Sequence, residues 1–210
     1  MCRGHRCAAC LRRVHVVDGV IVGYTGDGSR EERTFCLQDD LHALEAKLKE
    51  LGGVAAVVID PISAYLGGTD SHKNAEVRCL LAPLSNLAAR YNVAVIGVSH
   101  LSKAAGAQAL MRVNGSLAFV AAARAVYLVA ADPGDKVRRL FLPLKNNLGP
   151  DVDGLAFKIE GATVGSPAGI LETSRVMWAP EPVLMTADEA MQAAEGTPRR
   201  TSALDEAKEC

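Results

Sequence analysis

Seven consecutive residues constrain the fold more than any other part of this sequence. The run Val54 to Asp60 (VAAVVID) is apolar until it ends in a carboxylate. It is too short for a buried helix of usual length and is rich in β-branched residues, so it predicts a strand covered on both faces. Val93 to Ser99 (VAVIGVS) repeats this pattern, and Asn74 to Tyr91 carries apolar residues at helical spacing. Strand, helix and strand in this order predict two parallel strands of an α/β sheet.

The rest of the chain predicts further helices and a β extension. Pro83 should kink or break the helix at 74–91. From Gln38 to Leu51, leucines recur at spacings of three and four, with Asp39 and Asp40 in the first turn, which predicts an amphipathic helix. The later strands, joined by short turns, predict an antiparallel extension of the α/β sheet. The remaining predicted elements are a strand at Val14–Val17, a polar loop at Gly23–Glu32, a helix at Gly115–Ala122, strands at Ala125–Ala130, Arg138–Leu144 and Leu155–Glu160, and a helix at Ala187–Ala194.

The composition limits the partners and the compartment. The 210 residues hold 23 basic and 24 acidic side chains, a formal charge of −1, so no global basic field attracts nucleic acid or anionic lipid. No apolar run approaches the ~20 residues that span a bilayer, and the first residues lack the apolar segment of a signal peptide. We therefore expect a cytoplasmic protein with no membrane partner. Aromatic residues make up 4% of the chain, which argues against a stacking platform for single-stranded nucleic acid.

The first ten residues hold a cluster of metal-binding residue types. Cys2, His5, Cys7 and Cys10 could be drawn as a zinc knuckle. However, only Arg6 separates the two half-sites, whereas a tetrahedral site usually needs a longer loop between them. We therefore favour an unstructured terminal stretch over a zinc site. The six cysteines show no paired framework of the secreted kind, so free thiols are expected.

Two polar side chains follow the two predicted parallel strands. Asp60 ends the first strand, and His100 comes directly after the second. In open α/β sheets, ligands bind beyond the carboxyl ends of the strands, where a carboxylate can hold Mg²⁺ directly or through water. An imidazole at the same edge could hydrogen-bond a terminal phosphate. The alternatives are that Asp60 caps the following turn and that His100 is a solvated loop histidine.

Four stretches together give a specific family resemblance. The span from Val14 to Glu160 resembles the RecA-like ATPase core of the RepA/DnaB-type hexameric helicase family, in the AAA-type ATPase branch. The resemblance implies a mostly parallel RecA-like sheet flanked by helices, binding and hydrolysis of ATP with Mg²⁺, and assembly into a homo-oligomeric ring. It also implies a replication role with single-stranded DNA as a partner. The stretches are VVIDPISAYLGGTDSHKNAEVR, VIGVSHLSK, NGSLAFVAAARAVYLVA and LPLKNNLGP.

The same resemblance assigns roles to individual residues. Asp60 becomes the Walker B acid that holds Mg²⁺ through water, and His100 becomes the sensor after the next strand. Lys145 falls where ring-forming relatives place a cation that reaches into the neighbouring subunit's nucleotide site, and Arg124 is the other candidate. The structural alternative for Arg124 is a partly buried side chain that covers the sheet edge. Two further assignments are the nucleotide cleft, lined by Asp60, Ser63, His100 and Lys145, and the channel loop at Gly115–Ser116. The second basic position of the family is Asn147, which carries no charge.

One family motif does not occur in the chain. There is no G-x-x-x-x-G-K-[ST] phosphate loop, and the glycine-rich stretch Gly23 to Ser29 contains no lysine. In the family that loop precedes the segment corresponding to Val14, so we expect a truncated chain that is weak or inactive as an ATPase. The alternative is a non-catalytic fragment or degenerate subunit that keeps the fold and the subunit contacts. The expected domains are a cysteine-rich unstructured start at 1–13, a partial RecA-like ATPase domain at 14–179 without the first strands of the family domain, and a flexible or helical tail at 180–210.

Overall fold

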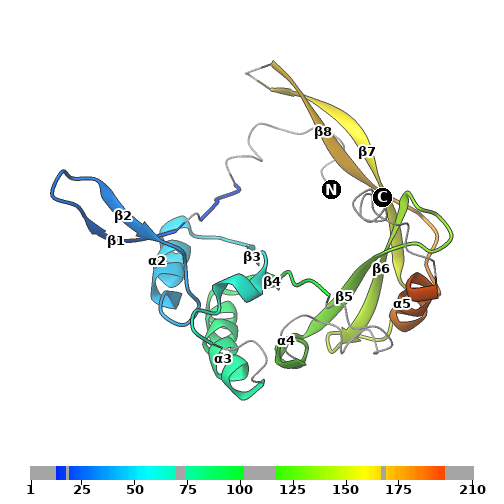
Figure 1. Ribbon diagram of the computed structural model, residues 1–210, viewed down its shortest axis with the longest axis horizontal. Helices are drawn as coiled ribbons and strands as arrows, with labels where there is room; N and C mark the ends of the chain where they lie inside the picture. The colour runs from blue at the N-terminus through cyan, green and yellow to red at the C-terminus, as the bar shows by residue number, and fades with distance from the viewer. Residues whose placement is uncertain (1–12, 18, 70–73, 102–116, 167–168, 197–210) are drawn as a thin grey trace, which may run out of the picture. The chain divides into compact units, whose positions relative to one another are not determined.

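The chain divides into two compact units, which Figure 1 shows in the colours of the chain order. The first unit comprises residues 1–102, 113–123 and 166–169, and the second comprises 103–112, 124–165 and 170–210. The computed structural model describes residues 13–17, 19–69, 74–101, 117–166 and 169–196.

The first unit contains the predicted parallel strand pair. β3 (Ala56–Ile59) and β4 (Ala94–Gly97) are hydrogen-bonded neighbours, and Ile59 stands opposite Gly97. The parallel pairing and the helix between the two strands confirm the mixed α/β prediction. Three other strand pairings of the described residues, β1–β2, β5–β6 and β6–β7, are antiparallel. The other elements of this unit are β1 (Val20–Tyr24), β2 (Arg30–Arg33), α2 (Leu41–Leu51), the 3₁₀ helix η1 (Ile62–Tyr65), α3 (Asn74–Tyr91) and α4 (Leu117–Ala122).

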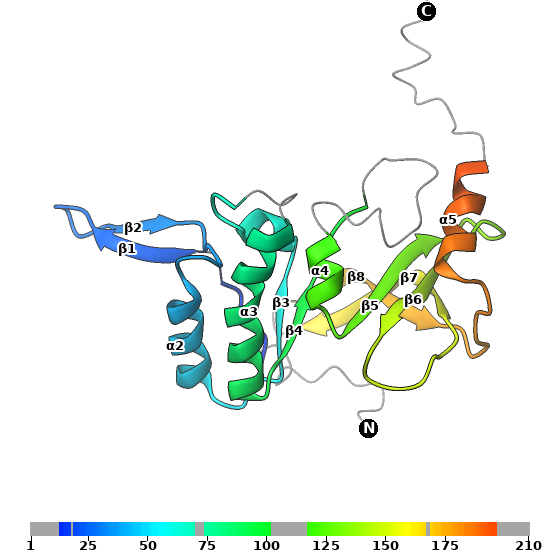
Figure 2. The same ribbon diagram turned by 90° about the horizontal axis from the view of Figure 1, so that it is seen from below.

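Helices cover one face of the β3–β4 pair. Figure 2 shows α2 and α3 side by side next to these strands. Buried residues of α3, α4 and η1 pack with Ile59, Val57 and Val95 in one apolar core. On the opposite face, Val58 and Ile96 are 62% and 50% exposed. The expectation that both strands are covered on both faces is therefore wrong for the described residues, because successive side chains of a strand alternate and only one set meets the helices.

The helix at Asn74–Tyr91 is continuous through its internal proline. α3 has the predicted bounds, and Pro83 lies inside it without dividing it, so the expected break does not occur. Pro83 is exposed, whereas Val77 and Leu84 are buried in the core. Water can therefore solvate the carbonyl that loses its hydrogen bond to the proline position, and the buried stripe holds the helix together.

The first strand of the chain lies later than predicted. Residues 14–17 form no strand, and the predicted polar loop is largely an antiparallel hairpin of β1 and β2. The turn Thr25 to Ser29 closes it: the Asp27 carboxylate accepts hydrogen bonds from the Thr25 hydroxyl and the Ser29 N–H, and Gly28 has a φ of 84°. These bonds, the one from Thr25 first, lower the pKa of Asp27 to about 2. Local turn hydrogen bonds therefore outweigh the polar composition of the stretch.

The acidic residues before α2 act outside the helix. The sequence predicted that Asp39 and Asp40 lie in the first turn of α2. The helix begins at Leu41, so both residues precede that turn. Asp40 is 2% exposed and accepts hydrogen bonds from both Nη atoms of Arg33, at 2.6 and 2.7 Å, and from the Cys36 N–H at 2.8 Å. The hydrogen bonds from Arg33 lower the pKa of Asp40 despite its burial. This ion pair joins β2 to the start of α2.

The described residues of the second unit form a four-stranded sheet and one helix. Its strands are hydrogen-bonded in the order β5-β6-β7-β8, and β6 pairs antiparallel with both β5 and β7, as expected of a β extension. The predicted strand at Leu155–Glu160 continues to Ser166, and β8 was not predicted. α5 packs against β5 and β6, and its residues Ala187, Ala190 and Met191 are buried. The bounds are β5 (Ala125–Ala131), β6 (Arg138–Asn146), β7 (Leu155–Ser166), β8 (Gly169–Trp178) and α5 (Ala187–Gly196).

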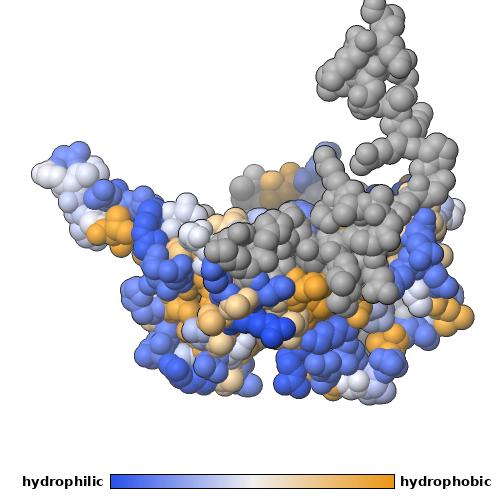
Figure 3. Space-filling view, turned by 60° about the horizontal axis from the view of Figure 1, so that its bottom comes forward, coloured by the Kyte–Doolittle hydropathy of each residue, from blue (hydrophilic) through white to orange (hydrophobic). Residues whose placement is uncertain are grey.

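Apolar side chains reach the surface in both units. Figure 3 shows hydrophobic residues, in orange, at several places on the displayed face, with hydrophilic residues between them. The most exposed large apolar side chains include Ile170 and Leu184, each 80% exposed. Within the part of the chain that the structure describes, no helix combines the length and the apolar character needed to cross a membrane.

Candidate functional site

Asp60 and His100 lie at the same edge of the β3–β4 pair. Asp60 directly follows the last residue of β3, and His100 comes three residues after the last residue of β4. Because the two strands are parallel and hydrogen-bonded to each other, their carboxyl ends meet at one edge. This is the placement that the sequence predicts for the two residues.

Backbone hydrogen bonds fix the segment that carries Asp60. The Val98 N–H donates to the Ile59 carbonyl, and the Ile62 N–H donates to the Val98 carbonyl, each at 2.9 Å. Asp60 and Pro61 therefore lie between two hydrogen bonds to Val98, the residue directly after β4. Ile62 is the first residue of η1, and its side chain is buried in the core. Ser63 is the second residue of η1, three positions after Asp60, and it is half-buried.

The Asp60 carboxylate is available to a ligand. Asp60 is exposed, and it makes no side-chain hydrogen bond or ion pair with the residues that the structure describes. Pro61, not Asp60, occupies the capping position of η1, and that helix has no side-chain cap. The turn-capping alternative for Asp60 therefore receives no support. His100 is also exposed, which fits both a phosphate contact and a solvated loop histidine.

The donor set at this edge fits a magnesium ion that is shared with a phosphate. Mg²⁺ prefers oxygen ligands, keeps several of its waters and usually takes only one or two protein carboxylates when it binds with a nucleotide. One exposed carboxylate on a fixed backbone meets that requirement. Among the described residues, no group of three or more His, Cys, Asp or Glu side chains forms a metal cage of protein ligands alone. Cys2, His5, Cys7 and Cys10 lie outside the described residues.

The other predicted site residues belong to the second unit. Lys145 lies near the end of β6, half-buried, opposite Val126 of β5. Arg124 precedes β5, and the Asn147 N–H donates to its carbonyl at 2.9 Å. The Arg124 guanidinium donates to the Asn147 carbonyl at 3.4 Å. Arg124 is exposed, which contradicts the alternative that it is a partly buried side chain covering the sheet edge. The structure thus brings Arg124, Lys145 and Asn147 to one strand end.

The predicted cleft combines residues of both units. Asp60, Ser63 and His100 are in the first unit and Lys145 is in the second, so the four-residue lining stays a prediction. The predicted channel loop at Gly115–Ser116 lies outside the described residues.

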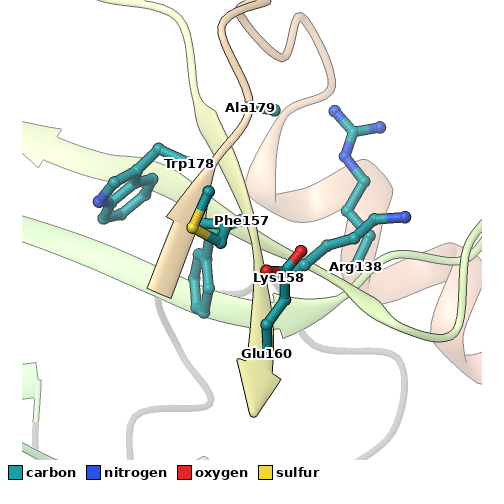
Figure 4. Close-up of a pocket in the computed structure, with 7 residues that line it drawn as sticks. Arg138, Phe157, Lys158, Glu160, Trp178 and Ala179 are labelled. Atoms are coloured by element: carbon teal, nitrogen blue, oxygen red, sulfur yellow. The ribbon is translucent and has the colours of Figure 1, made fainter. Parts of the chain in front are cut away.

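The structure also contains two surface hollows that the sequence did not indicate. One, of about 230 Å³, is lined by residues around the end of α2 and by Tyr91. The other, of about 220 Å³, lies in the second unit between β7, β8 and the start of β6, and Figure 4 shows Phe157 and Trp178 beside it. Neither hollow is lined by Asp60 or His100. Both are formed by residues far apart in sequence, so only the fold reveals them.

Comparison with known proteins links the first part of the chain to ATPases. The model of the AAA domain family matches residues 7–106, a stretch of 100 of the 210 residues. The matched stretch contains Asp60, Ser63 and His100. The match supports an AAA-type, P-loop ATPase-like relationship for this part of the chain. No curated protein matches the sequence.

Proposed function

We propose that this chain contributes the magnesium-binding and phosphate-sensing half of an ATPase site, in an AAA-type ATPase of the RepA-like helicase kind. The observation that carries the proposal is the exposed Asp60 carboxylate directly after β3, with His100 after the neighbouring parallel strand β4. The AAA family match over residues 7–106 supports the same conclusion independently of the geometry.

Each residue has a defined task in this proposal. Asp60 holds the metal through a water molecule, at the strand edge where α/β proteins bind nucleotides. Mg²⁺, when bound there, neutralises charge on the phosphates. His100 donates a hydrogen bond to a terminal phosphate oxygen and so distinguishes ATP from ADP. Ser63 follows Asp60 closely enough to contribute a hydroxyl to the same edge.

The proposal also gives a role to two cations of the second unit. Lys145 and Arg124 lie at one strand end, and a cation next to a phosphate stabilises the charge that develops during phosphoryl transfer. In a ring of identical subunits, Lys145 would serve the neighbouring subunit's site. Assembly into such a ring, and single-stranded DNA as its substrate, follow from the family resemblance and form part of the proposal.

Nucleotide binding tests the role of Asp60. Binding of a fluorescent ATP analogue is titrated with Mg²⁺ and with EDTA, for the unmodified protein and for Asp60→Asn. We expect Mg²⁺ to tighten binding, and Asp60→Asn to remove this effect because an amide is a much weaker magnesium ligand. Glu50→Gln is the matched control: Glu50 is an exposed carboxylate at the end of α2, and within the described ranges its ion-pair partner is Lys47.

The outcomes separate the proposal from its alternatives. Equal Mg²⁺ dependence in the Asp60 and Glu50 variants would disprove the metal-binding role. Binding that depends on Asp60, without release of phosphate, would identify the non-catalytic subunit. We expect no hydrolysis above background from these 210 residues, because they contain no lysine-bearing phosphate loop to position the transferred group.

A further inference from the structure

Four aromatic rings form a continuous cluster on the sheet of the second unit. Tyr127 stacks on Phe141 with ring centroids 4.5 Å apart and an interplanar angle of 15°. Trp178 contacts Phe141 at 6.0 Å and Phe157 at 5.2 Å. The whole chain has nine aromatic residues, so nearly half of them gather here. We call the surface formed by these four rings the aromatic face.

The strand register explains why the rings share one face. Phe141 of β6 stands opposite Val129 of β5 and Leu155 of β7, and Arg139 stands opposite Phe157. Side chains two residues apart on a strand point to the same face, so these residues lie together with the rings. The alternate residues, Leu128, Leu140, Leu142 and Ala156, are buried on the opposite face. The aromatic face is therefore the side of the sheet that the core of the unit does not use.

The aromatic face is open to a ligand. Trp178 is 53% exposed and Tyr127 is 42% exposed. The hollow of about 220 Å³ lies beside Trp178 and Phe157, and Figure 4 shows Lys158 and Arg138 on its other side. Rings of this size are normally covered in a soluble domain, and a continuous exposed apolar patch usually marks a binding surface.

The charge next to the rings is positive. The Arg139 guanidinium donates to the carbonyls of Lys136 and Arg138, and among the described residues it forms no ion pair with a carboxylate. Arg138 and Lys158 are neutralised by Asp132 and Asp135. Arg139 thus places an unbalanced positive charge on the same face as Phe157. A row of exposed rings beside such a charge suits a ligand with flat apolar groups and a negative backbone.

We propose that the aromatic face binds single-stranded DNA by stacking bases on Trp178 and Tyr127, with Arg139 next to the phosphates. Base stacking requires ring faces and no sequence-specific partner, and this face offers four rings. The proposal does not rest on the nucleotide site, because every residue it uses is in the second unit and Asp60 is in the first.

Trp178 is the only tryptophan and provides a direct probe. We expect an oligothymidylate of about 15 nucleotides to quench its fluorescence, because a stacked base quenches an indole ring. Binding of the fluorescently labelled oligonucleotide, followed by anisotropy, should weaken roughly tenfold or more in Trp178→Leu and in Tyr127→Leu. Arg139→Gln should reduce the salt dependence of binding by about one phosphate contact. Tyr24→Leu, which removes a 68% exposed tyrosine of the first unit, should bind normally.

Controls make the failure of this proposal distinct from that of the ATPase site. Asp60→Asn should bind the oligonucleotide like the unmodified protein, and circular dichroism should show that each variant is folded. Absence of quenching, or equal weakening by Tyr24→Leu, would overturn the proposal. If Trp178 emission instead changes on dilution of the protein alone, and Trp178→Leu shifts the protein to a smaller species, the face binds a second copy of this chain and not DNA.

Discussion

The Asp40–Arg33 ion pair should dominate the pH dependence of the first unit. Asp40 is 2% exposed, and it accepts two hydrogen bonds from Arg33 and one from the Cys36 N–H. Asp40→Asn keeps the size of the side chain and removes the charge. The variant cannot accept all three bonds, because one of its two side-chain termini is now a donor.

The loss should be about 2 kcal/mol in the free energy of unfolding. A hydrogen bond to a charged group contributes roughly 1.5–3 kcal/mol, and the removal of one partner of a fully buried pair costs about 3–5 kcal/mol. The Arg33 side chain is 43% exposed, so water solvates its charge once Asp40 is neutral. We therefore expect the free energy of unfolding to fall by about as much as one hydrogen bond to a charged group contributes.

The sign of the pH effect follows from the pKa of Asp40. Hydrogen bonds from Arg33 hold this pKa below its ordinary value in the folded state. A lowered folded pKa stabilises the protein above the unfolded pKa of about 3.9, and this stabilisation is lost as the pH falls through the folded pKa. The difference between the unmodified protein and Asp40→Asn should therefore be largest near neutral pH and should shrink below about pH 4.

Urea denaturation at several pH values tests this reasoning. Circular dichroism follows the helices, and Trp178 fluorescence reports on the second unit separately. Asp39→Asn is the matched control, because Asp39 is exposed and precedes the same helix. If Asp39→Asn and Asp40→Asn lower the stability equally, or if the Asp40 effect persists unchanged in acid, the ion pair does not have the assigned role.

Two backbone positions give further predictions. Gly67 has a φ of 67°, and a Cβ there would lie 2.5 Å from the Cys36 Sγ, so Gly67→Ala should lower the unfolding free energy by at least about 1–2 kcal/mol. Gly68→Ala, which meets nothing within 4 Å, should change it far less, and equal urea midpoints for the two variants would contradict the clash. Pro83→Ala should raise the stability by about 1–3 kcal/mol because it restores a hydrogen bond inside α3. A decrease in the urea midpoint of that variant would show that the proline ring makes a packing contribution.

The helices and strands that were predicted well are those in which the apolar residues of the sequence pattern are the residues buried in the structure. α3 was placed at its observed bounds because its apolar stripe faces the core. β3 and β4 were found from apolar runs, although only one face of each is covered. β8 was missed because every residue in it is exposed, so no alternation of apolar and polar residues marks it. That strand exists through pairing with β7, the strand before it, and the residue pattern within a single strand does not contain such a contact.

The candidate site was predictable only in part for a similar reason. The order of the elements indicates that Asp60 and His100 follow neighbouring parallel strands, and the pairing of β3 with β4 agrees. The exposure of the Asp60 carboxylate was not predictable, because it depends on the hydrogen bond from the Ile62 N–H to the Val98 carbonyl, after β4. Sequence alone also gave no reason to expect that the Asp40 side chain, at the N-cap position of α2, would bind Arg33 instead of capping the helix. Side-chain partners decide such cases, and the choice between them is made in three dimensions.

The aromatic face shows where an argument from composition fails. An aromatic content of 4% argues against a stacking platform only if the rings are spread over the fold. Tyr127, Phe141, Phe157 and Trp178 lie 14, 16 and 21 positions apart, about one strand and one turn each time. Successive antiparallel strands return the chain to the same place, so residues at this spacing become cross-strand neighbours. The relevant quantity is therefore the number of rings per sheet face. One sheet face of the second unit carries four rings, enough for a stacking surface, although the aromatic content of the whole chain is low.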